Sequence, residues 1–387
     1  SLTKISGTHD ENFILLEKIS NTKISLRGNL ITIKGKKKDT NIITSVVNKL
    51  LKKSLEKNHI DDEDVKSLYS FTSKDSQNDT IDLEENKYPT TNIKVHDFRK
   101  QIELIKNSQN KFINFDQLKS ILIDRQAYTG GKVLITIDDA FQSFYQNAWP
   151  ILKKENVPFI LFVNTREIND RHANYMSWDQ IREVHQSEIG TIGAHSFSHE
   201  YLVKLNQKDI AQDIELSHQD YLRELGFIPE VFSYPFGEYS TEIKKLAKKS
   251  KYKMAFGQHS GVVHQKEDLF ELPRFPINEA YGKIDRFKFI INTVPLPHKF
   301  YKPENKLITS NNPPAIEIEF VDSVKGINCF SNEGGQWGPS EITFLEKNWI
   351  KIILKKPFKT RRGKINCTLK LSDGTWGWFG RQYVLKN

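Results

Sequence analysis

Cysteine is scarce in this sequence: Cys329 and Cys367 are the only two among 387 residues, and neither has the CxxC spacing of a zinc ribbon or a redox site. One disulfide and two buried free thiols both remain open for this pair. Long apolar runs are missing as well, and none approaches the ~20 residues of a membrane-spanning helix. We therefore expect no transmembrane segment.

Two sequence signals are also absent. The first residues, SLTKISGTHDENF, lack the charged region, apolar stretch and cleavage site of a secretory signal, which predicts a cytoplasmic location. No GxxxxGK[ST] phosphate-binding loop occurs, which excludes a P-loop ATPase. What is present, 37% apolar and 11% aromatic residues, is enough to build packed cores in two or three globular domains.

Positive charge is concentrated near the end of the chain. The formal net charge is +9, and residues 341–387 hold eleven Lys or Arg against three acidic residues, a net charge of +8. Such a surface would attract a polyanion, whether nucleic acid or acidic glycan, and Arg361 and Arg362 are the central candidates. The competing interpretation is an ordinary solvated surface of a lysine-rich protein.

Changes in pattern along the chain predict three domains and a linker. Residues 1–71 mix helical and alternating segments, as in a small α+β domain, and the polar residues 72–87 are typical of a linker. Residues 88–300 alternate strand and helix patterns, which predicts an α/β domain with a parallel sheet closed or nearly closed into a barrel. Residues 313–387 carry short alternating strands, which predict a small antiparallel β-sandwich.

Candidate catalytic residues follow two of the predicted strands. Asp138 and Asp139 end the apolar strand VLITI, and His195 and His199 follow the strand EIGTIGA. An aspartate at a strand end is often only a helix cap. Histidines at i and i+4, however, can bind a metal together with a carboxylate from a neighbouring strand, which gives a two-histidine, one-carboxylate ligand set. The same set could hold Fe(II) in an oxygenase, but those folds are usually antiparallel jelly rolls, unlike the pattern here.

Four ordered motifs carry a family resemblance: TIDDA at 136–140, HSFSH at 195–199, and then FSYPFGEYS and ELPRFPINE. Over Glu84 to about His298 the chain resembles the NodB-type polysaccharide deacetylases of carbohydrate esterase family four, nearest to the poly-N-acetylglucosamine deacetylase branch. The resemblance implies a distorted (β/α) barrel. It also implies metal-dependent hydrolysis of N-acetyl, or O-acetyl, groups on a polysaccharide or amino-sugar glycan. The basic C-terminal segment would favour a glycan that is an anionic polymer.

The same resemblance implies roles for single residues. Asp138 would be the general base, and Asp139, His195 and His199 would hold a divalent metal, for which we expect Zn²⁺. The backbone N–H of Phe236 would donate to the oxyanion that forms during hydrolysis.

Two departures from the family pattern concern the base and its loop. Ser233 stands where the family often has an arginine that orients the base, and Arg274 in LPRFP is expected to take over that role. Ala140 replaces the usual glycine, which should matter little if its φ is negative.

A third departure concerns the general acid, which must protonate the departing amine. His298 fits the Leu-x-His motif of many relatives, whereas the poly-N-acetylglucosamine branch takes its acid from a Tyr-His pair near the start of the domain. This chain has no histidine there, at residues 80–83, and His259 and His264 are further candidates. We therefore predict weak or absent activity on unactivated N-acetyl sugars.

The first 71 residues carry a separate resemblance. The segments THDENFILLEK, LRGNLITIKG and IDDEDVKSLY resemble the KH-like N-terminal domain of PhoH-type ATPases, although the GxxG clamp of a KH domain is missing. This domain implies nucleic acid as a further partner. The alternative function is accordingly a catalytically impaired or inactive deacetylase homologue that binds glycan or nucleic acid.

Overall fold

The structure is a computed structural model, and its contacts divide the chain into two compact units, Ser1–Pro89 and Thr90–Asn387. The residues that it describes are 5–6, 10–27, 30–56, 60, 62–75, 91–127 and 130–386. Residues 80–83 and most of the predicted linker at 72–87 lie outside this set.

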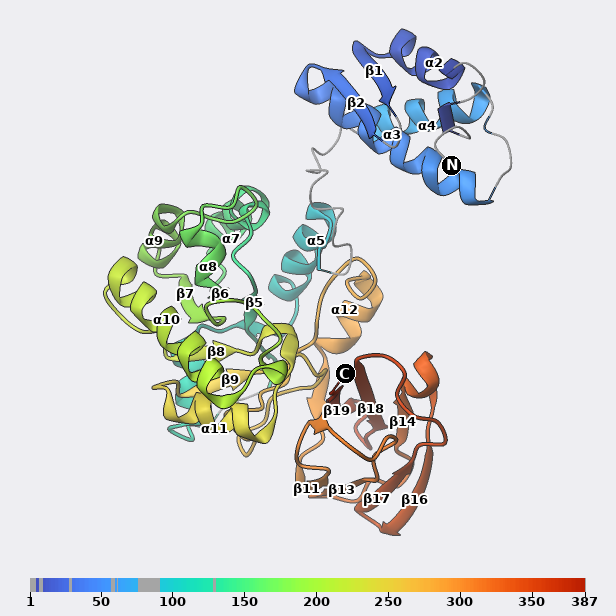
Figure 1. The fold of residues 1–387 in the computed structure, drawn as a ribbon. Helices are drawn as coiled ribbons and strands as arrows, with labels where there is room; N and C mark the ends of the chain where they lie inside the picture. The colour runs from blue at the N-terminus through green and yellow to red at the C-terminus, as the bar shows by residue number, and fades with distance from the viewer. Residues whose placement is uncertain are drawn as a thin grey trace. The chain divides into compact units, whose positions relative to one another are not determined.

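The first unit contains an antiparallel hairpin and helices (Figure 1). Its elements are α2 (Glu11–Ile19), β1 (Thr22–Arg27), β2 (Leu30–Gly35), α3 (Lys37–Glu56) and α4 (Asp62–Asp75). Apolar residues of α2 and α3, such as Leu16, Ile43 and Leu50, are fully buried in a shared core. The α+β character expected from the sequence is present in this described part.

The centre of the second unit is a five-stranded parallel sheet in the order β5-β6-β7-β8-β9 (Figure 1). The strands are β5 (Ile135–Ile137), β6 (Phe159–Val163), β7 (Gly190–Ala194), β8 (Val231–Ser233) and β9 (Met254–Phe256). Every residue of β6 is buried, because helices and loops cover both faces of the sheet. The sheet stays open, so the fold is a half-barrel rather than the closed or nearly closed barrel expected from the alternation of strands and helices.

Helices and a short sheet surround the half-barrel. The helices are α5 (Val95–Lys106), α6 (Phe115–Leu122), η3 (Phe144–Ala148), α7 (Trp149–Glu155), α8 (Thr165–Asn169), α9 (Trp178–Gln186), η4 (Leu202–Lys204), α10 (Gln207–Leu225), η5 (Pro235–Gly237), α11 (Thr241–Lys249) and α12 (Ile284–Ile290). The short strands β3 (Lys111–Phe112) and β4 (Lys132–Val133) pair in parallel. Side-chain caps start several helices: Asn114 begins α6, Ser177 begins α9 and Asn206 begins α10.

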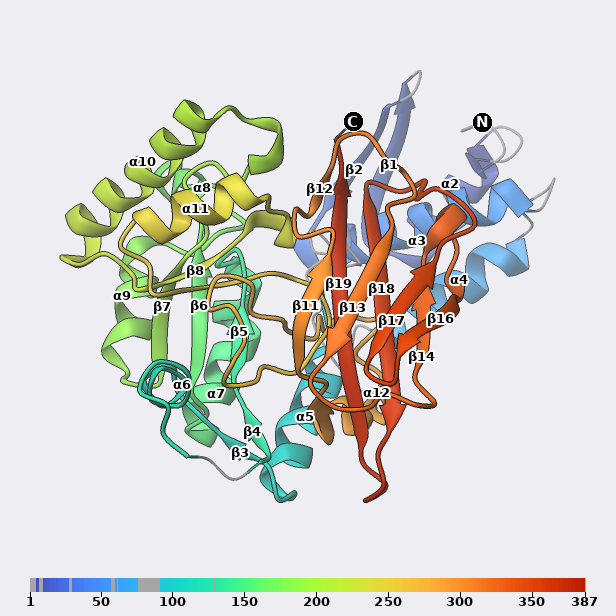
Figure 2. The ribbon, with the colours of Figure 1, turned by 90° about the horizontal axis from the view of Figure 1, so that it is seen from below.

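Two further sheets form the β-rich part of the second unit (Figure 2). The larger sheet contains β10 (Thr293–Pro295), β12 (Leu307–Ile308), β14 (Asn328–Ser331), β15 (Gly338–Pro339), β18 (Arg362–Lys370) and β19 (Trp376–Leu385). The smaller sheet contains β11 (His298–Lys302), β13 (Ile316–Phe320), β16 (Glu341–Glu346) and β17 (Trp349–Ile353). Their inward residues, such as Phe320, Ile350 and Phe379, share one core, as in a β-sandwich. Because β10, β11 and β12 pair with later strands, these sheets begin before residue 313, where the sequence pattern placed their start.

The two cysteines form a disulfide across neighbouring strands of the larger sheet. Cys329 on β14 lies directly opposite Cys367 on β18, and both side chains are buried. Of the two possibilities left open by the sequence, the structure contains the disulfide.

Removal of this disulfide is expected to destabilise the β-rich part. The bond closes a loop across a sequence separation of 38 residues, for which loss of the cross-link typically costs about 2–4 kcal/mol of unfolding free energy. Urea unfolding of the Cys329→Ala/Cys367→Ala variant, followed by tryptophan fluorescence, measures this change. Treatment with reductant should lower the parent's midpoint to that of the variant; a parent midpoint unaffected by reductant would contradict the pairing.

Within the part of the chain that the structure describes, no helix has both the length and the apolar character to cross a membrane.

Candidate active site

The carboxyl edge of the parallel sheet brings the predicted site residues together. Asp138 and Asp139 follow β5, and His195 follows β7, two strands away in the same sheet. Carboxyl ends of parallel strands meet at one edge, so side chains far apart in sequence converge there. Asp139 (φ 72°) and His199 (φ 51°) both adopt left-handed backbone conformations, which cost non-glycine residues free energy and cluster at functional sites.

Asp139, His195 and His199 form a group that we call the metal-site triad. The Oδ1 atom of Asp139 lies 3.1 Å from Nε2 of His199 and 3.5 Å from Nε2 of His195. Two ligands of a tetrahedral Zn²⁺, each bound at ~2.1 Å, lie ~3.4 Å apart. The spacing of the triad therefore suits a shared divalent cation.

Hydrogen bonding supports the same fit. Nδ1 of His195 donates to the carbonyl oxygen of Ser233 (2.7 Å), so the lone pair of its Nε2 faces Asp139. Oδ1 of Asp139 is buried and has no hydrogen-bond partner among the described residues. An acceptor nitrogen facing an unpartnered carboxylate oxygen is unfavourable without a cation between them.

Protonation states agree with this arrangement. Burial would raise the pKa of Asp139, but the neighbouring imidazoles of His195 and His199 outweigh burial and hold it well below its usual range. Burial would lower the pKa of His199, but the Asp139 carboxylate outweighs this effect and raises it. The Asp139 carboxylate is therefore ionised and available to a cation, which would displace a proton from His199 on binding.

We expect one divalent metal ion per chain, and His195→Ala should remove it. The imidazole of His195 is almost fully buried, with 1% of its surface exposed, so no water-exposed group can replace it. Elemental analysis of dialysed protein measures the stoichiometry. His185→Ala, a change to an exposed histidine on α9, is the control. Equal metal content in His195→Ala and the parent would contradict the assignment.

Asp138 is held by Arg274 in a two-pronged ion pair. Nη1 and Nη2 of Arg274 each lie 2.7 Å from a different carboxylate oxygen of Asp138. Nη2 also donates to the hydroxyl of Ser233 (2.8 Å), and Nη1 to the hydroxyl of Thr136 (3.1 Å). Arg274 thus contacts the carboxylate expected to act as base. Ser233, at the position where the family often has an arginine, accepts a hydrogen bond from Arg274.

This pair sets the charge of Asp138. Burial would raise the pKa of its carboxyl group, but Arg274 and then His195 outweigh burial and hold the pKa below its usual value. Asp138 is therefore ionised at neutral pH, as a proton acceptor must be.

Ala140 does not meet the condition under which replacement of the usual glycine would matter little. Its φ is +54°, a left-handed conformation that favours glycine. Its methyl group is fully buried in the barrel core, and this packing offsets part of the backbone strain.

The structure also shows supporting residues that the sequence did not indicate. Both carboxylate oxygens of Asp213, on α10, accept hydrogen bonds from the loop that carries His199: from N–H of Phe197 (2.9 Å) and N–H of Ser198 (3.0 Å). The Phe236 ring lies 4.5 Å from the imidazole of His199 and stacks on Tyr201 at 4.1 Å, centroid to centroid. An aromatic wall therefore stands beside the metal-site triad. The SHEY segment, with Tyr201 two residues after His199, is the only local signal for it.

His298 lies in a different cluster. Its Nε2 accepts from Nη2 of Arg381 (2.8 Å), and its ring lies 5.9 Å from that of His264, whose Nε2 is 2.9 Å from Glu267. Burial, followed by Arg381, lowers the pKa of His298 to about 3, so its imidazole is neutral at pH 7. Among the described residues, no hydrogen bond or ion pair links this cluster to the metal-site triad. His298, expected as a general acid, thus has no such contact with the triad among these residues and is neutral rather than the imidazolium from which a histidine acid donates.

His264, Glu267 and His298 are spaced like a second set of metal ligands. Arg381, however, already supplies positive charge there, since its Nη2 lies 3.3 Å from Oε1 of Glu267. Because Nε2 of His298 accepts from this guanidinium, the remaining proton of that ring lies on Nδ1, which then cannot bind a metal. The guanidinium takes the place that a cation would need.

Arg361 and Arg362 both contact the buried carboxylate of Glu238. Their guanidinium groups donate to it at 2.7–3.0 Å. The two side chains stay 21% and 30% exposed, and one carboxylate balances only one of their two charges, so binding of an acidic polymer there stays a prediction.

Comparison with known proteins follows this geometry. A family model described as polysaccharide deacetylase matches residues 125–255. The Bacillus subtilis protein YxkH, which carries a provisional polysaccharide deacetylase name, is 29% identical over 148 residues; the match covers 38% of this chain and 51% of YxkH. Poly-β-1,6-N-acetyl-D-glucosamine N-deacetylase of Staphylococcus epidermidis is 26% identical over 229 residues, which cover 56% of this chain and 79% of that enzyme.

Solved structures are also similar. The deacetylase PplD of Streptococcus pyogenes is 21% identical, with a TM-score of 0.49 over 52% of this chain and 89% of PplD. IcaB of Ammonifex degensii is 22% identical, with a TM-score of 0.47 over 51% and 88%. These matches give no support to a PhoH-type first domain. The family model and the related sequences identify residues 125–255 of this chain as a domain of the polysaccharide deacetylase family.

Proposed function

We propose that this protein hydrolyses N-acetyl groups of a polysaccharide of N-acetylated amino sugars and depends on a divalent metal, with Zn²⁺ expected. The single observation that carries the proposal is the metal-site triad beside the Asp138–Arg274 pair at the edge of one sheet. The relative from Staphylococcus epidermidis, named for poly-β-1,6-N-acetyl-D-glucosamine, supports this class of substrate.

Each residue has a task in this proposal. A divalent cation held by the metal-site triad supplies polarisation of the acetyl carbonyl and makes a water molecule more acidic. Asp138, oriented by Arg274, accepts the proton of the attacking water. The backbone N–H of Phe236 donates to the carbonyl oxygen as it becomes negative. The ring of Tyr201, stacked on Phe236, offers an apolar face to a sugar.

Incubation of metal-loaded protein with N-acetylglucosamine oligomers, β-1,4- and β-1,6-linked, followed by mass spectrometry, tests this function. Each deacetylation lowers the mass by one acetyl group, and chelation should abolish the change. Oligomers that keep their mass, together with acetyl esters that remain uncleaved, would refute the proposal.

The cluster that contains His298 favours a second candidate: a metal-binding homologue with impaired catalysis that binds glycan. Binding of an anionic polymer stays a prediction, because the Glu238 carboxylate balances only one of the two charges of Arg361 and Arg362. Binding of nucleic acid by the first unit stays a prediction without support from the related proteins.

We further propose that the β-rich part folds in an oxidising compartment, since structural disulfides form and persist there. This proposal opposes the cytoplasmic location predicted from the first residues. Thiol titration of protein purified under non-reducing conditions tests it: no free thiol is expected, and two would overturn it.

A further inference from the structure

The turn that carries Phe236 is held partly by residues of the β-rich part. It follows β8 and includes Phe236 at φ 59° and ψ 8°, a left-handed conformation that phenylalanine adopts only at a cost. Such a conformation persists where surrounding contacts hold it.

Glu238, two residues after Phe236, receives the strongest of these contacts. Its carboxylate is completely buried and accepts from Nε of Arg361 (2.9 Å and 3.0 Å), from Nη2 of Arg361 (2.7 Å) and from Nε of Arg362 (2.8 Å). A buried carboxylate is tolerated only when paired and hydrogen-bonded in this way. Both arginines come from the β-rich part, more than 120 residues later in the chain.

The same guanidinium groups support the aromatic wall. The Cζ atom of Arg361 lies 4.0 Å from the ring centre of Tyr201, and that of Arg362 lies 5.6 Å from the ring centre of Phe236. Cation–π contacts of this kind fix ring positions as well as charge. The rings beside His199 are therefore backed by residues of the β-rich part.

A third residue contacts the turn directly. Nε2 of Gln382, on β19, donates to the carbonyl oxygens of Phe236 (3.4 Å) and Gly237 (3.2 Å). Arg361, Arg362 and Gln382 together thus contact three consecutive residues, from Phe236 to Glu238.

We infer that Arg361, Arg362 and Gln382 are positioning residues for the deacetylation reaction: they hold the Phe236 turn, and with it the oxyanion donor and the aromatic wall, in the catalytic arrangement. This inference rests on the proposed function. It gives the β-rich part a task in building the active site, separate from the polymer binding that its charge suggested.

Arg361→Met in the full-length, metal-loaded protein is the main test. The substitution removes the guanidinium group but keeps an unbranched apolar side chain. We expect kcat on an acetyl ester to fall about 10–10²-fold, since loss of a complete oxyanion donor costs ~10²–10³. KM should stay within about twofold and metal content unchanged, because neither the triad nor its ligands are altered. General destabilisation would lower both kcat and metal content, so a fall in kcat at unchanged metal content indicates a positioning role.

Conservative variants sharpen the test. Arg362 makes one hydrogen bond to Glu238, so Arg362→Lys should retain most activity. Arg361→Lys should lose activity, because lysine cannot reproduce the two-pronged contact with Glu238 or the stacking on Tyr201. Arg361→Met combined with Glu238→Gln should be no worse than the more impaired single variant, because both act through one contact. Additive losses would overturn the inference.

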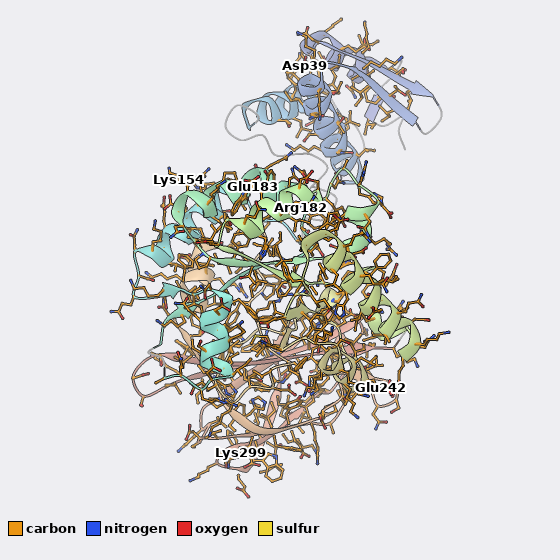
Figure 3. The ribbon with its side chains drawn as sticks, turned by 90° about the vertical axis from the view of Figure 1, so that its left-hand side faces the viewer. Asp39, Lys154, Arg182, Glu183, Glu242 and Lys299 are labelled. Atoms are coloured by element: carbon orange, nitrogen blue, oxygen red, sulfur yellow. A yellow bond between two sulfur atoms is a disulfide. The ribbon has the colours of Figure 1, made fainter. Side chains whose placement is uncertain are left out.

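Lys299→Ala, on the exposed surface of β11, is the matched charge control and should keep parental kcat (Figure 3). If Arg361→Met fails to fold, Gln382→Ala replaces it, with an expected fall in kcat of about threefold to tenfold. Unchanged kcat in a folded Arg361→Met or Gln382→Ala variant refutes the inference.

Amide hydrogen exchange separates this inference from the proposed function. Residues 234–238 should exchange faster in Arg361→Met than in the parent, while β6 and β7 stay protected. If the turn exchanges faster in Arg361→Met but the parent cleaves neither amide nor ester, the proposed function is refuted and the support of the turn is established. If exchange is unchanged in Arg361→Met and the parent is active, only the support of the turn is refuted.

Discussion

Asp138→Asn should lower kcat on an N-acetylated oligomer about 10²–10⁴-fold while the metal content remains that of the parent. The amide keeps the size of the carboxylate but cannot accept a proton, and a general base contributes a factor of this order. Asp138 is not one of the three triad residues, so its loss leaves the ligands intact. Steady-state kinetics and elemental analysis of the same preparation measure both quantities.

The low pKa of Asp138 makes this prediction specific. A carboxylate paired with Arg274 is a weak base and can take a proton only from a water that has been made acidic. Base and metal are therefore needed together, and neither suffices alone. Turnover that survives Asp138→Asn would mean that another group takes the proton.

Arg274→Met is the companion variant. It removes the guanidinium that lowers the pKa of Asp138 and leaves burial, which raises it. The base works only when deprotonated, so its activity is lost as the pH falls through that pKa. The acidic limb of the kcat profile should therefore move to higher pH in Arg274→Met, and an unmoved limb would show that Arg274 does not act on the base.

The parts of the site that could be predicted from sequence are those encoded locally. Asp138 and Asp139 end an apolar strand, and His195 and His199 end another, so the strand pattern alone brings them to one sheet edge. Helix α10 likewise has local signals at both ends: the side chain of Asn206 caps its start, and the left-handed Gly226 ends it.

The parts that could not be predicted depend on contacts between distant segments. Glu238 stands within the quoted motif FSYPFGEYS, but nothing near it reveals that its partners are Arg361 and Arg362. A count of positive residues likewise cannot distinguish a paired arginine from a free one. The backbone of Ala140 escaped prediction because alanine itself gives no sign of a positive φ, which tertiary packing imposes.

Acetyl esters with a good leaving group should be cleaved in a metal-dependent reaction, whereas N-acetylglucosamine oligomers should react at least ~10²-fold more slowly. Amide hydrolysis stalls unless the departing nitrogen receives a proton, and a general acid typically contributes ~10²–10⁴ to that step. A phenolate leaves without one. The comparison therefore isolates protonation of the leaving nitrogen, the step for which the described residues offer no evident donor.

The positions of the candidate acids underlie this expectation. His298 accepts a hydrogen bond from Arg381, and burial lowers its pKa to about 3, so at neutral pH it is the neutral imidazole and not the imidazolium from which a histidine acid donates. His259 is buried, and its pKa is likewise lowered to about 3, first by burial and then by Arg381. His264 faces Glu267 in the same cluster as His298. Residues 80–83, where the related branch has its acid, contain no histidine and lie outside the described residues.

His298→Ala tests whether the protein lacks a general acid or whether His298 serves as one. If the acid is missing, the variant keeps the parent's ratio of ester to amide turnover, because His298 contacts Arg381 rather than the substrate. Amide turnover within the ordinary enzyme range of ~1–10³ s⁻¹ in the parent, lost in this variant, would overturn the prediction and establish His298 as the acid. Amide turnover in that range that survives the change would also overturn it and would move the search to His259 and His264. Slow amide turnover beside rapid, chelator-sensitive ester cleavage is the expected outcome, since the residues that would hold the metal, the proposed base and the proposed oxyanion donor are together, and no described residue is placed to give the nitrogen its proton.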